Sequence, residues 1–131
     1  MIGMNGTAGS LFEHTLRGEN GYFSHIVTQM QYSAVAGACM MVKKDIFEKM
    51  NGFDEGYKGE LGKVDLCLKI RNKHISVVYN PYVEMVRWSN ELQNNENDEK
   101  IFKKQWAEIL EKGDPYYNKN LSLSVSGCNI R

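Results

Sequence analysis

The sequence predicts a single α/β domain over residues 1–131, built on a small mixed sheet with flanking helices. One observation is that segments with the apolar pattern of strands alternate along the chain with segments in which apolar residues recur at helical spacing. A second is the composition: 42% of the residues are hydrophobic and 24% are charged, as in globular domains and unlike disordered tails. We therefore treat the chain as one folded unit.

The strongest strand signal is the run of small and apolar residues at 33–42, which is typical of a strand buried on both faces. Ile75, Val77 and Tyr79 occupy every second position, as in a strand, and residues 82–88 are predicted to form a further extended segment. Residues 1–33 are expected to hold a short strand and a long loop. A sheet of so few strands has open edges, so we expect another segment or a second copy of the chain to cover them.

Three helices are predicted from apolar residues at helical spacing and from start and stop signals. The first covers residues 45–50 and ends at an Asn-Gly pair, and the second runs from about residue 63 to 73. The third, over residues 98–112, is capped by Asn97 and ends at Gly113. These helices are expected to flank the sheet.

Charge and cysteine content exclude several classes of protein. The 16 Lys and Arg residues balance the 16 Asp and Glu residues, so the charge gives no reason to expect a nucleic acid as a partner. The three cysteines include no C-x-x-C pair, which favours reduced thiols, with Cys39 and Cys67 as small buried residues. The apolar runs are too short to span a membrane. We expect a cytoplasmic protein, either free or peripheral at the inner face of the membrane.

Several short motifs occur together in a characteristic order. They are AVAGACMMV at 34–42, GFDE at 52–55, VDLCLK at 64–69, VYNP at 78–81 and DPYYNKNL at 114–121. Each motif is weak by itself, but their order resembles the second half of family-2 glycosyltransferases, and above all the bacterial members similar to rhamnosyl- and galactosyltransferases. The resemblance covers nearly the whole chain.

The resemblance implies part of a GT-A fold, the fold of nucleotide-diphospho-sugar transferases. This chain would be the acceptor-side half, and the half that binds the nucleotide through a D-x-D motif is expected to be absent from it. The full enzyme would move a sugar from a UDP- or dTDP-sugar to a glycan or polysaccharide acceptor, using a divalent Mn or Mg ion. We expect this half to bind no cofactor and to be inactive by itself, with the missing amino-terminal half or a second copy as its partner.

Two positions depart from the family pattern. The family's catalytic base, the first Asp of D-V-D, corresponds to Lys63, and a protonated lysine has no lone pair to accept a proton. The family's histidine, which often binds the metal, corresponds to Arg87, which cannot bind a cation. Glu60 and Asp65 are the nearest carboxylates that could replace the base. Asp65 also fits a structural role, because Lys69 follows it by one helical turn.

Other candidate site residues each have a functional and a structural interpretation. Asp54 and Glu55 line the acceptor pocket or form a solvated turn. Gly37 and Ala38 face the donor sugar or allow close packing. Trp88 is the better candidate for stacking on a sugar, whereas Trp106 lies on a helical stripe and is expected in the core. His14, His25 and His74 lack the spacing of a metal site and receive no role.

Two functions are consistent with these observations. The first is a transferase part that works in the biosynthesis of a polysaccharide. The second is a non-catalytic, degenerate transferase module that binds a glycan or another protein, an alternative favoured by Lys63 and Arg87. The sequence leaves open whether the chain is an enzyme.

Overall fold

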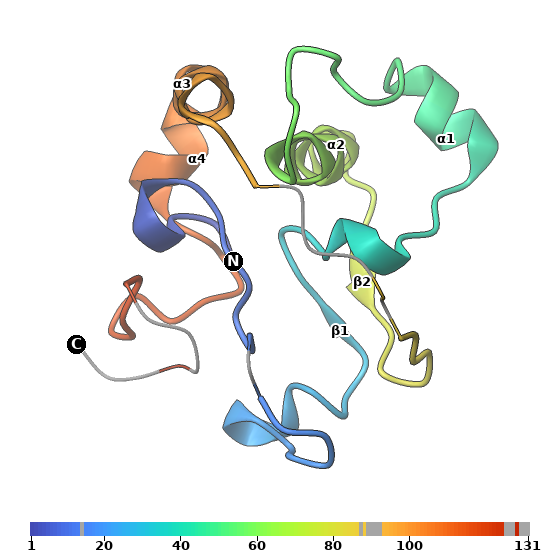
Figure 1. Ribbon diagram of the computed structural model, residues 1–131, viewed down its shortest axis with the longest axis vertical. Coiled ribbons are helices and arrows are strands. Elements are labelled where there is room, and N and C mark those ends of the chain that lie inside the picture. Colours follow the sequence, from blue (N-terminus) through green and yellow to red (C-terminus); the bar gives the residue numbers. More distant parts are fainter. Residues whose placement is uncertain (14, 87, 89–92, 125–127, 129–131) are drawn as a thin grey trace.

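The computed structural model describes residues 1–13, 15–86, 88, 93–124 and 128 (Figure 1). In chain order the elements are the 3₁₀ helices η1 (Met4–Gly6) and η2 (Tyr22–Ser24), strand β1 (Met30–Gln31), the 3₁₀ helix η3 (Gly37–Cys39), helices α1 (Lys44–Lys49) and α2 (Leu61–Arg71), strand β2 (Val78–Tyr79), and helices α3 (Glu96–Gln105) and α4 (Ala107–Lys112). Helix α2 lies between α1 and the pair formed by α3 and α4 (Figure 1).

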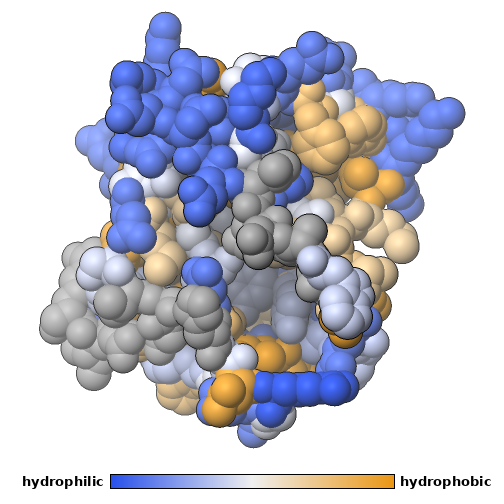
Figure 2. Space-filling view, in the orientation of Figure 1, coloured by the Kyte–Doolittle hydropathy of each residue, from blue (hydrophilic) through white to orange (hydrophobic). Residues whose placement is uncertain are grey.

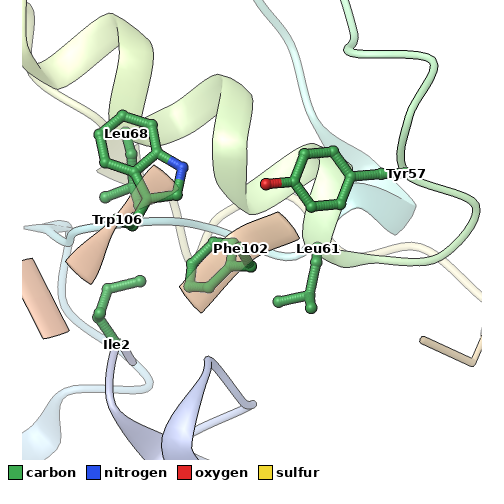
Figure 3. Packing of buried hydrophobic residues seen from close by; sticks show 6 residues of the cluster. All are labelled: Ile2, Tyr57, Leu61, Leu68, Phe102 and Trp106. Carbon is green, nitrogen blue, oxygen red and sulfur yellow. The ribbon is translucent and has the colours of Figure 1, made fainter. Parts of the chain in front are cut away.

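Helix α2 is buried on two sides, and each side belongs to a different apolar cluster. Leu61 and Leu68 pack with residues of α3, of the turn before α4 and of the amino-terminal segment. The members of this first cluster are Ile2, Tyr57, Leu61, Leu68, Phe102 and Trp106, with Phe102 in the middle (Figure 3). Burying large apolar side chains such as these is the main favourable contribution to folding. The predicted core position of Trp106 is confirmed.

The other side of α2 forms the second cluster, which contains Leu66, Cys67, Ile70 and Val77. Partly buried residues of α1 and of the segment 34–42 cover it: Ala34, Val35, Met40, Val42, Ile46, Phe47 and Met50. The prediction that Cys67 is buried is confirmed. Because both faces of α2 are apolar, the helix acts as the centre of the fold and not as an amphipathic surface helix.

The sheet differs from the prediction. Strands β1 and β2 pair in an antiparallel ladder, with Met30 opposite Tyr79, so among the described residues the sheet has two strands and is not mixed. The predicted central strand at 33–42 is wrong, because Gly37 to Cys39 turn in η3. Its small side chains reach α2 from one side, while Met41 is 99% exposed and Cys39 is exposed, contrary to the prediction of burial.

The strand expected over residues 75–79 is reduced to β2, and none of the described residues in 82–88 forms a strand. Cover for the sheet edges, by another segment or a second copy of the chain, was expected because a sheet of few strands has open edges. The described sheet, β1 and β2, is also small, so this expectation stays a prediction.

The helices occur close to their predicted places but with shifted ends. Helix α2 begins at Leu61, two residues before the predicted start, and α1 is confirmed to end before Asn51, which has a positive φ of 60°. Helix α3 begins at Glu96 because Asn95, and not Asn97, accepts a hydrogen bond from the backbone of Asp98. The predicted single helix up to residue 112 is two helices, separated at Trp106, where φ is −113°.

The carboxylate of Asp65 connects α2 with the end of α3. Its side chain is 0% exposed. Oδ1 accepts hydrogen bonds from Nε2 of Gln105 at 2.6 Å and from the indole nitrogen of Trp106 at 3.0 Å. Oδ2 lies 2.7 Å from Nζ of Lys69, which confirms the predicted ion pair one helical turn away. A buried carboxylate is tolerated when charge and hydrogen bonds compensate it in this way.

Asp114 ties the amino-terminal segment to the tail. It accepts the backbone N–H of Ile2 at 2.8 Å and the hydroxyl of Ser33 at 2.6 Å. Ser33 in turn accepts a hydrogen bond from Arg71 at the end of α2, and the Arg71 guanidinium lies over the ring of Tyr116. The DPYY segment noted in the sequence therefore holds three distant parts of the chain together.

Replacing Asp65 by alanine is predicted to destabilise the protein by about 3 kcal/mol, because it leaves the buried indole and amide donors and the ammonium of Lys69 without an acceptor. Asp45→Ala is a matched control, because Asp45 pairs with Lys49 at the same spacing on the exposed surface of α1. The control should lose less than about 0.5 kcal/mol. Urea denaturation measures both values, and equal losses would contradict the structural role of Asp65.

The buried side chain of Tyr57 leads us to predict that the stability of the protein falls at high pH. Burial, with further contributions from Asp65, Asp54 and Asp98, raises the pKa of the Tyr57 hydroxyl above the usual 10.0. The neutral phenol is therefore favoured in the folded state, and its contribution to stability is complete below pH 10.0 and decreases as pH rises further.

Tyr57→Phe is expected to lose less stability than the wild type between pH 10 and pH 11.5 in urea denaturation, because the variant has no phenol to ionise. At pH 7 the change should be small, since the hydroxyl donates a long hydrogen bond of 3.3 Å to Gln105. The exposed Tyr82 provides the control variant Tyr82→Phe. The same alkaline loss in Tyr57→Phe and wild type would show that this phenol is not responsible.

Candidate functional site

A cleft of about 1100 Å³ opens between the amino-terminal loop and the start of α2. Its walls come from residues 8–13, 15–19, 25–27, 32, 34–37, 79 and 81–84, from the first residues of α2, and from Met1, Gln93, Asn94 and Glu99. Figure 2 shows a hollow in the middle of this face, with apolar surface at its lower edge. Its size is that of a ligand site and not of a packing defect.

The start of α2 brings Glu60 and Lys63 into the cleft wall. Nζ of Lys63 donates a hydrogen bond to Oε1 of Glu60 at 2.6 Å. The two side chains are 26% and 24% exposed, so the pair is partly protected from water. An ion pair at such a site is stronger than one on the surface, because fewer water molecules compete with it. Lys63 has the carboxylate of Glu60 as its partner here.

Gly37 packs closely against the side chain of Lys63. A Cβ atom at position 37 would lie 1.8 Å from Cδ of Lys63, a distance that real atoms cannot share. A larger residue at position 37 would therefore displace the side chain of Lys63, and the effect is one of space and not of backbone conformation, because Gly37 does not have a positive φ. The structure brings together Gly37 and Lys63, which the sequence analysis had placed in the site for separate reasons.

The loop before α2 is held by side chains that follow it by more than thirty positions. The buried carboxylate of Asp98 accepts the backbone N–H groups of Lys58 at 3.0 Å and of Gly59 at 2.8 Å. The side chain of Asn94 accepts the N–H of Leu61 at 2.9 Å, which caps α2 from another segment. These bonds fix the helix end that carries Glu60 and Lys63.

Asp65 does not line the cleft. Its carboxylate is buried and is used by Lys69, Gln105 and Trp106. Glu60 and Asp65 were the two carboxylates proposed to replace the family base, and the structure places Glu60 alone of these two in the cleft wall.

Other sequence candidates lie outside the cleft. Asp54 accepts the N–H of Gly56 at 2.9 Å, as in a polar turn, and Glu55 is exposed. Ala38 is exposed in η3, and Trp88 is 95% exposed. None of these four lines the cleft. Arg87, at the family's histidine position, lies outside the described residues.

Aromatic side chains form a further part of the cleft lining, and the sequence patterns did not predict it. Phe12, His25, Tyr32 and Tyr79 line the cleft, and we call these four residues the aromatic wall. Their ring centroids are 6.1–6.4 Å apart in edge-to-face contacts. No spacing in the sequence predicts the aromatic wall, because its members lie in a long loop, in β2 and in the segment after β1.

The described lining of the cleft is acidic. It contains five carboxylate side chains, those of Glu13, Glu19, Glu60, Glu84 and Glu99, against two cationic side chains, Arg17 and Lys63, and the amino-terminal ammonium of Met1. Three of the carboxylates have cationic partners: Glu84 lies 2.7 Å from Arg17, Glu60 contacts Lys63, and Glu99 lies 2.9 Å from Lys103. This charge pattern repels a diphosphate and suits a neutral ligand.

The described residues offer no metal site, since no group of three or more His, Cys, Asp or Glu side chains within them is arranged to hold an ion. Among the helices that the structure describes, none combines the length and the apolar character needed to cross a bilayer.

Comparison with known proteins identifies two similar sequences. The chain is 31% identical over 136 residues to an uncharacterized protein of Sinorhizobium fredii, an alignment that covers 94% of this chain and 15% of that protein. It is 27% identical over 139 residues to the O-antigen biosynthesis protein RfbC of Myxococcus xanthus, covering 100% of this chain and 11% of that protein. The chain thus spans less than a sixth of the length of these curated relatives. Neither a family model nor a solved structure matches the sequence.

Gly37→Ala is predicted to destabilise the protein by about 1–2 kcal/mol, because the new methyl group displaces the side chain of Lys63 and breaks its contact with Glu60. In a Lys63→Ala background the same change should be neutral or stabilising by a few tenths of a kcal/mol, roughly the effect of a restricted unfolded chain. Thermal or urea denaturation of the wild type, the two single variants and the double variant gives the coupling free energy between positions 37 and 63. An additive result would mean that Lys63 does not pack on Gly37.

Proposed function

We propose that this chain forms the acceptor side of a GT-A glycosyltransferase of family 2 that acts in the biosynthesis of a polysaccharide. The observation that supports this most is the similarity along its whole length to an O-antigen biosynthesis protein. The ordered motifs at 34–42, 52–55, 64–69, 78–81 and 114–121 support the same class. In this proposal the cleft receives the glycan that is extended.

The charge of the cleft supports an acceptor in preference to a donor. Five described carboxylates against three cationic groups, Arg17, Lys63 and the amino terminus of Met1, disfavour a nucleoside diphosphate, whereas the hydroxyls of a neutral glycan accept and donate hydrogen bonds without a charge penalty. We therefore place the nucleotide-sugar and its divalent metal in another part of the full enzyme. No step through the metal is derived from this chain.

Glu60 is our candidate for the group that receives the proton of the acceptor hydroxyl. In such a transfer, the hydroxyl oxygen forms a bond to the anomeric carbon, the bond from that carbon to the diphosphate breaks, and the proton passes to a carboxylate. The ion pair with Lys63 uses Oε1 of Glu60, and the carboxylate has a second oxygen for this role. Lys63 itself holds Glu60 in place within the cleft wall.

A second function is supported by the same ion pair. Lys63 brings an ammonium to the position where the resemblance expects the base, and it is bound to Glu60. This is the arrangement expected of a degenerate module that binds a glycan, or a protein, without transferring a sugar. In both proposals the chain by itself has no transferase activity, and the two differ in whether Glu60 acts when the donor part is supplied.

Part of the surface suits contact with another protein domain. Met85, Val86 and Trp88 are exposed, lie close together in the sequence and do not line the cleft, and neighbouring exposed apolar residues mark interaction sites. We propose that the donor-binding part of the full enzyme covers them. The small share of each relative that the chain spans is consistent with such a part.

Calorimetric titration tests the proposal. Neutral oligosaccharides built of galactose, glucose or rhamnose should bind with a dissociation constant on the order of 1 mM, a value common for weak, solvent-competed ligands. UDP- and dTDP-sugars should not bind, with or without manganese, and a mixture of donor and oligosaccharide should give no product by mass spectrometry. Metal-dependent binding of a nucleotide-sugar would contradict the assignment to the acceptor side, and absence of any oligosaccharide binding would overturn the proposed function.

A further inference from the structure

Two polar atoms near the cleft have no hydrogen-bond partner among the described residues. They are Nδ1 of His25 and the hydroxyl oxygen of Tyr32, and both are buried. A buried polar atom without a partner is destabilising, and in native structures such atoms are few. Both residues belong to the aromatic wall. A ligand that supplies hydroxyl groups at this wall would give each atom its missing partner.

Within the aromatic wall, the missing hydrogen bonds are confined to His25 and Tyr32 among the described residues. The hydroxyl of Tyr79 donates a hydrogen bond to the carbonyl oxygen of Ile26 at 2.9 Å, so its polar end is satisfied within the chain. The rings of His25 and Tyr32 lie 6.3 Å apart, and Tyr32 lies 6.1 Å from Tyr79. The unsatisfied atoms thus belong to two adjacent rings that line one part of the cleft.

Aromatic rings combined with unsatisfied polar atoms suit a sugar ring. The face of a pyranose that carries C–H groups packs on aromatic side chains, while its hydroxyls need donors and acceptors at the edge. Nucleobases also stack on aromatic rings, but a nucleotide brings phosphate charge into a lining whose described carboxylates outnumber its cations. A neutral pyranose offers C–H groups and hydroxyls to the wall and brings no negative charge into the cleft.

We infer that the aromatic wall is a binding subsite for one neutral pyranose unit, with Phe12 and Tyr79 against the ring and with His25 and Tyr32 bound to its hydroxyls. This inference rests on the proposed function, because it names the ligand class of the same cleft. Nδ1 of His25 and the Tyr32 hydroxyl are covered in the free protein. The inference therefore requires both side chains to turn on binding, so that these atoms face the ligand.

Removing the Tyr32 hydroxyl distinguishes a ligand role from a structural one. Tyr32→Phe eliminates a buried hydroxyl without a partner, so the stability of the free protein stays equal or increases. Affinity for methyl pyranosides of galactose, glucose or rhamnose is expected to fall fivefold to tenfold, roughly the value of one hydrogen bond. A residue with a purely structural role would not lower affinity while stability is maintained.

His25→Gln and the control His74→Gln complete the experiment, because His74 is exposed and does not line the cleft. Affinity should fall for the first variant and stay unchanged for the second, and the His25 ring resonances of the wild type should shift on addition of sugar. Tyr79→Phe is a further comparison, since it loses a satisfied bond and should lose stability instead.

The possible failures are separable. If the wild type binds the neutral oligosaccharides but Tyr32→Phe and His25→Gln bind them equally well, the subsite is wrong while the proposed function stands. If UMP or dTMP, and not the pyranosides, shifts the His25 resonances, the assigned ligand class is wrong. If the wild type binds no sugar of any kind, the proposed function and the subsite both fail.

Discussion

The arrangement of helices around α2 depends on the buried carboxylate of Asp65. A charge in this position is costly, and it is compensated by the ion pair with Lys69 and by hydrogen bonds from Gln105 and Trp106. Because these last two partners lie at the end of α3 and in the turn before α4, the bonds fix where α3 and α4 meet α2. Trp106 leaves the helical conformation where its indole reaches Asp65, so the break between α3 and α4 accompanies this contact.

The same helices position the cleft. Once α2 is fixed, its first turn projects Glu60 and Lys63 into the cleft wall, and Asp98 and Asn94 hold the preceding loop. Gly37 leaves the space that the side chain of Lys63 occupies. The site therefore depends on a core that lies behind it: residues that touch no ligand determine where the ligand-facing residues stand.

The helices could be predicted from sequence, and the sheet could not. Helix positions follow from the helical spacing of apolar residues and from the stop signal at Gly113. The apolar run at 33–42 fits two structures equally well, a buried strand and an irregular segment packed on a helix. Met41 shows the difference, because it is apolar and yet exposed.

The residues that line the cleft could be predicted in part. Lys63, Glu60 and Gly37 could be placed in it through the resemblance, and the pairing of Asp65 with Lys69 follows from helical spacing. The aromatic wall was missed because its contacts join residues far apart in the sequence, and such contacts leave no local pattern.

The central claim is that the cleft is where a neutral glycan binds, and the most direct measurement is the location of a bound sugar by NMR. With methyl-labelled protein and an unlabelled neutral oligosaccharide, we predict intermolecular NOEs from sugar protons to the methyl groups of Ala36, Val35 and Val64, which line the cleft. NOEs confined to exposed residues elsewhere, such as Met41 or Val86, would contradict the account.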